Sequence, residues 1–225
     1  MGAPLIDSRG RLIPSGRFPE PRLANPDGLL ALGGDLEPAT LLAAYRQGIF
    51  PWSVDPISWW SPDPRAIIEF NDFRLSRRRA RYLRNGGFRF SFDEAFTAVM
   101  KECARPAPGR RSTWISPAFV RAYSRLHDLG HAHSVECWLE DRLVGGVYGV
   151  VVGGLFAGES MFSRVSNAST LALAVLLEHL QRRGFTLFDS QVISPHTASL
   201  GAREIPREEY LSRLRQALAQ NCPFA

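Results

Sequence analysis

Three apolar runs joined by very short turns dominate the middle of this chain. The runs are AHSVECWL, LVGGVYGVVV and LFAGES, at residues 132–139, 143–152 and 155–160, and the turns lie at residues 140–142 and 153–154. Connections of this length join antiparallel neighbours, because parallel strands need a long crossover. We therefore predict an antiparallel sheet at the centre of the fold.

Helical patterns surround these strands. A long helix is predicted over residues 167–183, and an apolar run then leads into a strand that ends at Asp189. Antiparallel strands followed by a helix and another strand are typical of an α+β fold, with a mainly antiparallel sheet flanked by helices. Further helices are predicted at residues 76–85, 93–101, 117–129 and from Pro206 onward.

The first 65 residues differ from the rest of the chain. They are rich in proline and glycine, and three of the five tryptophans lie at residues 52–60. Pro38 suits the first position of a short helix and Gly48 the residue beyond its end. We predict a small, aromatic N-terminal domain at residues 1–65 and a second domain at residues 66–225.

Positive charge is concentrated in one segment. The chain has 27 basic residues, all arginine except Lys101, and a net charge of +5. Seven arginines and no acid lie at residues 74–89, where Arg77, Arg81 and Arg84 would share one face of a helix. Charge runs usually form solvated faces. Like charges one turn apart nevertheless cost a few tenths of a kcal/mol per pair, which a phosphate partner would offset.

Several classes of protein are disfavoured. No run approaches the roughly 20 apolar residues of a membrane span, and residues 1–16 have no signal-peptide core. The three cysteines are odd in number, far apart and without metal-type spacing, which favours reduced thiols. We expect a cytoplasmic protein, and nothing in the sequence requires more than a monomer.

Polar side chains end two of the predicted strands. Glu159 follows the apolar run of FAGES, and Asp189 and Gln191 belong to FDSQ at residues 188–191. Side chains alternate along a strand, so Asp189 and Gln191 are expected to point the same way. One such acid is most often a cap or a salt-bridge partner, but two on neighbouring strands predict a polar site in an apolar cleft.

Two other groups of residues resemble functional sites, but a structural interpretation is favoured for each. His127, His131 and His133 lack the cysteine pair that would complete a zinc site, so we predict a structural role and no metal. His196, Ser190 and Asp189 lie in one short segment without a G-x-S-x-G elbow, which disfavours a hydrolase triad. Among the loop tryptophans, Trp59 and Trp60 are predicted to fill the core of the small domain, whereas Trp52 and Trp114 could equally provide stacking faces for a base.

Together these segments resemble the leucyl/phenylalanyl-tRNA–protein transferases of bacteria. The motifs are LLAAYRQGIFPW, WWSPDPR, TWI, LHDLGHAHSVECW, GGVYGVVVGGLFAGESMFSR and DSQVISPHTASLGAREIPR, in one order over almost the whole chain. The resemblance implies transfer of leucine or phenylalanine from leucyl-tRNA or phenylalanyl-tRNA to proteins with N-terminal arginine or lysine, which marks them for degradation. It also implies a small N-terminal domain before a domain like the GCN5-related acetyltransferases, and no cofactor.

The resemblance also assigns residues. Asp189 and Gln191 match positions proposed to guide the amine, and Glu159 matches a pocket position whose charge could hold the acceptor. Ser190 stands where many relatives have cysteine, and Ser194 where asparagine is common. Positions matching the cleft for the terminal adenosine and the aminoacyl side chain are Tyr45, Trp52, Trp114 and Phe156. The residues predicted to bind the tRNA backbone are Arg77, Arg78, Arg79, Arg81 and Arg84.

This chemistry suits a site without a nucleophile or a metal. An aminoacyl ester is already activated, so the enzyme needs only to position the reactants, deprotonate the amine and stabilise the oxyanion. One rival is a coenzyme-A-dependent acetyltransferase, but the segment before the long helix, MFSRVSNAS, lacks the glycines of a pyrophosphate loop. The other rival, a noncatalytic RNA-binding protein, leaves the polar strand ends unexplained.

Overall fold

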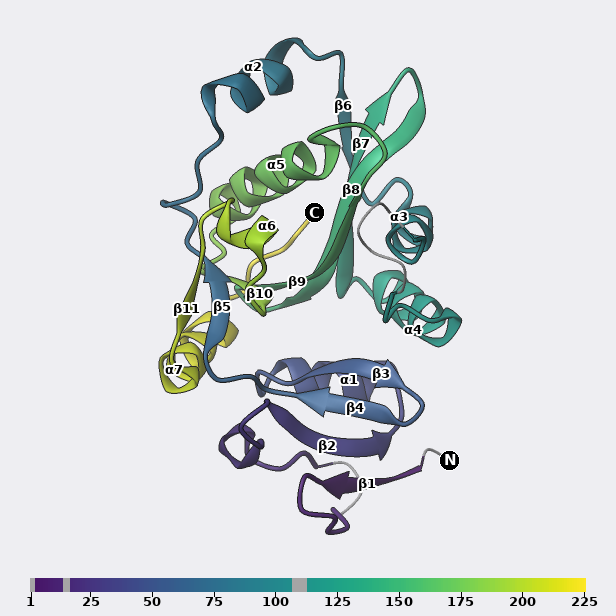
Figure 1. Ribbon diagram of the computed structural model, residues 1–225, viewed down its shortest axis with the longest axis vertical. Coiled ribbons are helices and arrows are strands. Elements are labelled where there is room, and N and C mark those ends of the chain that lie inside the picture. Colours follow the sequence, from purple (N-terminus) through teal and green to yellow (C-terminus); the bar gives the residue numbers. More distant parts are fainter. Residues whose placement is uncertain (1–2, 14–16, 107–112) are drawn as a thin grey trace.

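The computed structural model describes residues 3–13, 17–106 and 113–225 and arranges them around two sheets. A four-stranded sheet has the order β1-β2-β4-β3, and a seven-stranded sheet has the order β11-β5-β10-β9-β8-β7-β6. Figure 1 shows the smaller sheet at one end of the molecule, below the larger one. No helix of the described residues is long and apolar enough to cross a membrane.

The smaller sheet is antiparallel throughout and packs against one helix. That helix begins at Pro38, where the missing N–H has no partner to lose, as predicted. It is followed by Gly48, whose φ is +74°. A Cβ at Gly48 would lie 2.8 Å from the ring of Tyr210, so only glycine fits this close approach. The elements are β1 (Ala3–Asp7), η1 (Pro21–Leu23), β2 (Leu29–Gly34), α1 (Pro38–Tyr45), β3 (Phe50–Val54) and β4 (Ile57–Trp60).

The predicted antiparallel strands form the centre of the larger sheet. Residues Glu140 and Asp141 turn the chain with positive φ, and Gly153 does so at the next turn. One pair, β9 with β10, is parallel, and the chain crosses between them through a helix. The strands are β5 (Arg65–Ile68), β6 (Arg89–Phe92), β7 (Ala132–Leu139), β8 (Arg142–Val152), β9 (Leu155–Ser163), β10 (Leu187–Gln191) and β11 (Ala202–Ile205).

Helices cover both faces of the larger sheet (Figure 1). The long helix α5 packs on one face, while α3 and α4 pack on the other. The third helix begins at Phe96, three residues later than predicted, because Asp93 has a φ of 60° and its carboxylate accepts the backbone N–H of Ser134. The helices are α2 (Arg77–Asn85), α3 (Phe96–Cys103), α4 (Pro117–Asp128), α5 (Ala168–Arg182), α6 (Pro195–Ala198) and α7 (Arg207–Leu218).

Two hydrophobic cores result, and one of them joins the two sheets. The core between α5 and the larger sheet includes Leu176 and Phe188. The other core includes Trp59 from the smaller sheet together with Tyr148 and Ala157 from the larger one. The α+β fold class is therefore confirmed, whereas the division of the chain at residue 65 stays a prediction.

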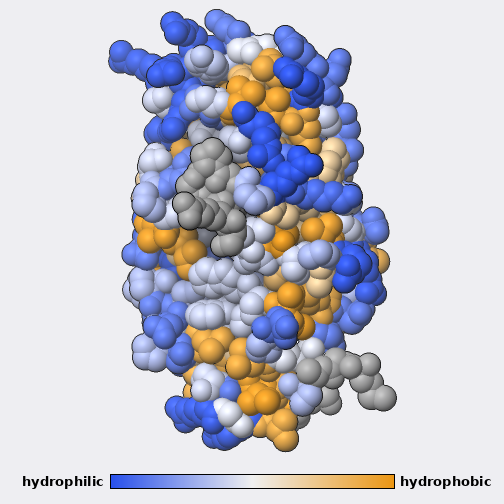
Figure 2. Space-filling model, turned by 45° about the vertical axis from the view of Figure 1, so that its right-hand side comes forward, coloured by the Kyte–Doolittle hydropathy of each residue, from blue (hydrophilic) through white to orange (hydrophobic). Residues whose placement is uncertain are grey.

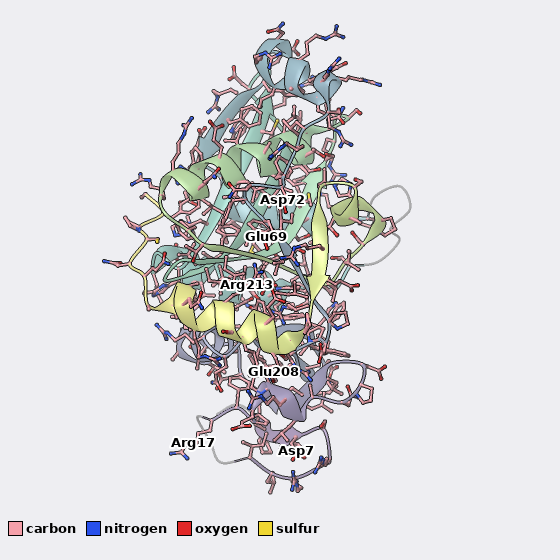
Figure 3. The ribbon with its side chains drawn as sticks, turned by 90° about the vertical axis from the view of Figure 1, so that its left-hand side faces the viewer. Asp7, Arg17, Glu69, Asp72, Glu208 and Arg213 are labelled. Atoms are coloured by element: carbon pink, nitrogen blue, oxygen red, sulfur yellow. The ribbon has the colours of Figure 1, made fainter. Side chains whose placement is uncertain are left out.

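Helix α7 forms ion pairs both with the N-terminal part and with residues beside the larger sheet. Figure 3 shows Glu208 on the side of α7 toward the N-terminal part and Arg213 close to Glu69. Glu208 accepts Nε of Arg22 at 2.5 Å, and Glu69 accepts Nη1 of Arg213 at 2.6 Å. Because the Arg22 pair is exposed, solvent screens its attraction, and the shared core carries most of the contact.

Candidate active site

Bulges on two neighbouring strands bring the polar strand ends together. The parallel pairing of β9 with β10 is in register as far as Ala157 and Asp189. Just beyond, Glu159 is the extra residue of β9 where it pairs with β8, and Ser190 is the extra residue of β10 where it pairs with β5. Bulges bend a strand and redirect its side chains. At the bulge Gln191 has a φ of 66°. The orientation of its side chain relative to Asp189 is therefore not set by the simple alternation on which the sequence analysis relied.

Glu159 is buried at the centre of a hydrogen-bonded cluster. Its Oε1 accepts the hydroxyl of Tyr45 at 2.7 Å and Nε2 of Gln191 at 2.8 Å. Its Oε2 accepts the hydroxyl of Tyr123 at 3.4 Å, and the two tyrosine hydroxyls lie 2.5 Å apart. Helices α1 and α4 and strand β10 thus each supply one donor to the carboxylate.

The environment tunes the pKa of Glu159 towards neutrality. Burial raises the pKa to about 7 and the negative charge of Asp189 adds to this, against the three hydrogen bonds that lower it. Burial, followed by the charge of Glu159, raises the pKa values of Tyr45 and Tyr123 well above the ordinary value. The tyrosines are therefore donors, and Glu159 is the group that can exchange a proton near pH 7.

Asp189 has a different environment, because donors occupy both of its oxygens. Nε and Nη2 of Arg65 donate to the carboxylate at 2.9 and 2.6 Å, and the hydroxyl of Tyr210 donates at 2.8 Å. The backbone N–H of Gln191 donates to it at 2.8 Å. The side chains of Asp189 and Arg65 are each 1% exposed. The carboxylate is thus engaged by an arginine and not by His196, which agrees with the low expectation of a triad.

The sequence analysis missed Tyr123, Tyr210 and Arg65, and Arg65 is the charged one among them. Its guanidinium also donates to the carbonyl of Gly48 at 3.1 Å and lies over the rings of Phe50 and Tyr210, at 4.8 and 4.4 Å from their centroids. Burial is the largest single influence and lowers its pKa, but the charges of Asp189, Tyr210 and Glu159 and the hydrogen bonds to Asp189 together raise it. The available signal was a lone arginine at the start of the apolar strand RAII, within the motif WWSPDPR.

A cavity of about 140 Å³ opens onto Glu159 and Gln191. Trp52 and Trp114 line it and are half-buried, so their rings face the cavity as well as the core. Ser190 also lines it, and the hydroxyl oxygen of Ser190 is buried without a hydrogen-bond partner among the described residues. The complete lining is Phe50, Pro51, Trp52, Trp114, Glu159, Ser190, Gln191 and Val192.

Two of the predicted cleft residues lie outside this lining. Tyr45 is behind Glu159 and reaches the site only through its hydroxyl. Phe156 is on the opposite face of β9, in the core beside α5, where it stacks on Phe188 with a centroid distance of 5.6 Å. Alternation along the strand sends Phe156 and Ala157 to opposite faces. A direct contact of Phe156 with the substrate stays a prediction.

The arginines of α2 lie apart from the cavity. Ser76 caps the helix as predicted, and none of the helix residues is buried. Nε of Arg79 donates to Asn167 at 3.1 Å. Among the described residues, no acid forms an ion pair with any arginine of this helix, and Figure 2 shows strongly hydrophilic side chains projecting from the end of the molecule where Figure 1 places α2.

The histidine cluster has hydrogen-bond partners within the protein. Asp93, His127 and His133 offer ligand atoms within 4.8 Å of one another, so they could in principle hold a cation. However, Nδ1 of His133 contacts Asp93 at 2.7 Å, and Nδ1 of His127 contacts the carbonyl of Ala132 at 2.8 Å. These contacts give both imidazole rings hydrogen-bond partners within the protein, and a structural role stays our prediction.

Comparisons with known proteins converge on one family. Residues 67–215 match the family described as leucyl/phenylalanyl-tRNA protein transferase, and residues 34–63 match its N-terminal domain. The transferase of that name from Yersinia enterocolitica is 55% identical over 203 residues, 88% of this chain and 85% of that protein. The one from Escherichia coli O81 is 54% identical over 200 residues, with 88% and 85% covered. Among solved structures, a GCN5-related N-acetyltransferase from Kribbella flavida is 12% identical, with a TM-score of 0.41 over 71% of this chain and 58% of that one.

Proposed function

Because the chain belongs to the leucyl/phenylalanyl-tRNA protein transferase family, we propose that it joins leucine or phenylalanine from charged tRNA to the α-amino group of proteins with N-terminal arginine or lysine. It is an aminoacyltransferase. The match over most of the chain supports this reaction. The observation that carries the proposal is the cavity, where Trp52 and Trp114 lie beside Glu159, whose carboxyl has its pKa raised to about 7. The proposal includes action as a monomer in the cytoplasm.

In this proposal Glu159 is the proton acceptor. The acceptor nitrogen attacks the ester carbonyl, the bond to the ribose oxygen breaks, and the amine proton passes to the carboxylate and then to the leaving hydroxyl. A base with a pKa near the working pH combines a large ionised fraction with adequate proton affinity. Asp189 is less suited, because four hydrogen bonds from Arg65, Tyr210 and Gln191 already hold its oxygens.

Asp189 and Gln191 then serve as the orienting pair. Asp189 holds the backbone N–H of Gln191, and the side-chain Nε2 of Gln191 donates to Glu159. This arrangement leaves the amide oxygen of Gln191 as an acceptor for an N–H of the incoming amine. The ion pair with Arg65 fixes Asp189, so the charge of Asp189 positions Gln191 and raises the pKa of Glu159.

The donor end fits the other wall of the cavity. Trp52 and Trp114 offer aromatic faces on which the terminal adenine can stack. The hydroxyl of Ser190, which has no partner in the protein, can donate a hydrogen bond to an oxygen of the substrate. In this role Ser190 is not a nucleophile, and no acyl-serine forms. An apolar surrounding accepts leucine and phenylalanine and rejects charged side chains, because burying an unpaired charge is costly.

The experiment that tests the reaction is a transfer assay with the full chain. Labelled leucyl-tRNA is incubated with a model protein that begins with arginine, and the matched control is the same protein beginning with glycine. Label should enter the first protein at its N-terminus and not the second. Absence of transfer to either protein, together with acetyl transfer from acetyl-coenzyme A, would reject the proposed function.

A further inference from the structure

A short exposed segment leads away from the cavity. We propose that residues 192–196, between β10 and the first turn of α6, guide the unpaired nucleotides that precede the terminal adenosine of the donor tRNA. The inference rests on the proposed function and extends it, because it assigns a site to a part of the donor that the cavity does not hold. We call this segment the 3′-end track.

The first support is an apolar surface next to the cavity. Val192 and Ile193 are 38% and 39% exposed, and Val192 lines the cavity itself. Other large exposed apolar side chains in the described chain, such as Leu12 and Leu129, are isolated from one another in sequence and do not line it. Two adjacent apolar side chains leading out of a ligand cavity suit the faces of unstacked bases.

The far end of the track, at His196, experiences the positive charge of helix α2. The side chain of His196 is exposed, although its ring is partly desolvated; this desolvation, followed by the positive charge of Arg79, lowers its pKa. Arg79 belongs to α2. The chain geometry agrees, because a Cβ at Gly201, just beyond α6, would lie 3.6 Å from the carbonyl oxygen of Asp72, in the segment that leads into α2. The track therefore runs from the cavity at Val192 towards α2. A few nucleotides on this path would lead from the adenosine pocket to backbone phosphates on α2.

The track is also a preformed surface. The hydroxyl of Ser194 accepts the N–H of Thr197 at 3.1 Å, and Oγ1 of Thr197 accepts the N–H of Ser194 at 2.9 Å. The N–H of Val192 donates to the carbonyl of Ser190 at 2.8 Å. Serine and asparagine cap helices equally well, so the serine at 194 keeps this geometry. A rigid surface loses little entropy when a flexible strand binds it.

Charge favours nucleotides over the acceptor protein as the occupant. There is no acid at residues 192–203, and the unpaired arginines of α2 lie beyond the track. An acceptor with N-terminal arginine or lysine would be repelled by these arginines, whereas phosphates would be attracted. The acceptor must therefore reach the amine position from another side.

The test uses the double variant Ile193→Ala with His196→Ala and three donors of increasing length. These are aminoacyl-adenosine, an aminoacylated CCA trinucleotide and full-length charged tRNA. The variant should react like the parent with aminoacyl-adenosine but lose roughly five- to hundredfold in kcat/KM with the two longer donors, the worth of stacking one base. The matched control is Leu129→Ala, an exposed apolar residue at the end of α4 that should change none of the three rates.

A direct binding measurement separates this inference from the proposed reaction. Affinity for the uncharged CCA trinucleotide should fall in the double variant and rise in Ile193→Trp, which enlarges the stacking face. Parent-like trinucleotide binding in both variants would overturn the track whether or not transfer occurs. Equal losses with all three donors would also overturn it, since they would place the effect in the cavity.

Discussion

Arg65 and the arginines of α2 are the same kind of side chain in opposite surroundings. Arg65 is 1% exposed and donates to the carboxylate of Asp189 and the carbonyl of Gly48. The α2 arginines at positions 77, 78, 81 and 84 are exposed, and no acid in the described chain pairs with them. A buried charge must be paired inside the protein, because its lost hydration costs several kcal/mol.

The comparison shows that the surroundings of an arginine, and not its charge alone, indicate its role. All the interactions of Arg65 are made within the protein, so it holds a shape and positions Asp189. The α2 arginines keep their hydration and their donors, so they can exchange water and counterions for phosphates at little cost. Substitutions should therefore affect stability at the first site and ligand binding at the second.

The largest expected effect is at the buried pair. Replacing Arg65 by Met leaves Asp189 charged and unpaired, which should lower the free energy of unfolding by about 3–5 kcal/mol and abolish most transfer. The matched control, Arg77→Gln on α2, should change it by less than about 0.5 kcal/mol. Urea unfolding of the two variants measures both values.

A second substitution sharpens this result. Adding Asp189→Leu to Arg65→Met removes the unpaired charge and should recover part of the lost stability. Transfer should not recover, because nothing then holds the backbone of Gln191 beside Glu159. Full recovery of transfer in the stable double variant would show that the pair has no positioning role.

The next effect concerns the base. Glu159→Gln keeps the shape of the side chain but cannot take a proton, and should lower turnover by roughly 10²- to 10⁴-fold. The carboxyl of Glu159 has its pKa raised to about 7, chiefly by burial. The parent gains its carboxylate as pH rises through about 7, so the ratio of parent to variant rates should rise over that range.

Both proteins use the same acceptor amine, so its titration affects both rates equally and cancels in the ratio of parent to variant rates. Single-turnover rates from pH 5.5 to 8.5 would measure it. A ratio that is flat across this range would mean that Glu159 acts by holding the acceptor and not by taking its proton. Gln191→Ala provides a comparison, since it should lower the rate without removing the dependence on pH.

The smallest effect on the chemical step is expected at α2. Replacing Arg77, Arg81 and Arg84 by Gln should weaken binding of full-length charged tRNA and flatten its salt dependence by up to about three units of slope. Reaction with aminoacyl-adenosine should be unchanged. Equal losses with both donors would place these arginines in folding or in the cavity, and the contrast with Arg65 would fail.

Local signals predicted much of the fold correctly. The strands at 132–139 and 142–152 were found because tight turns and apolar runs need no distant partner to be recognised. The helix after Ser76 was found from its cap. The strand at Arg65–Ile68 was missed, since four residues carry too short a pattern. The extra residue at Ser190 was invisible too, because a bulge depends on how the neighbouring strands pair.

The sequence by itself determined the antiparallel centre of the fold, the unbalanced charge of α2 and the identity of the polar strand ends. Only the tertiary structure decided what those ends do. Asp189 meets Arg65 across 124 residues, and Glu159 meets Tyr45 across 114. Caps, turns and alternation act over a few residues, whereas the proton affinity of a buried carboxyl depends on burial and on donors that distant elements supply.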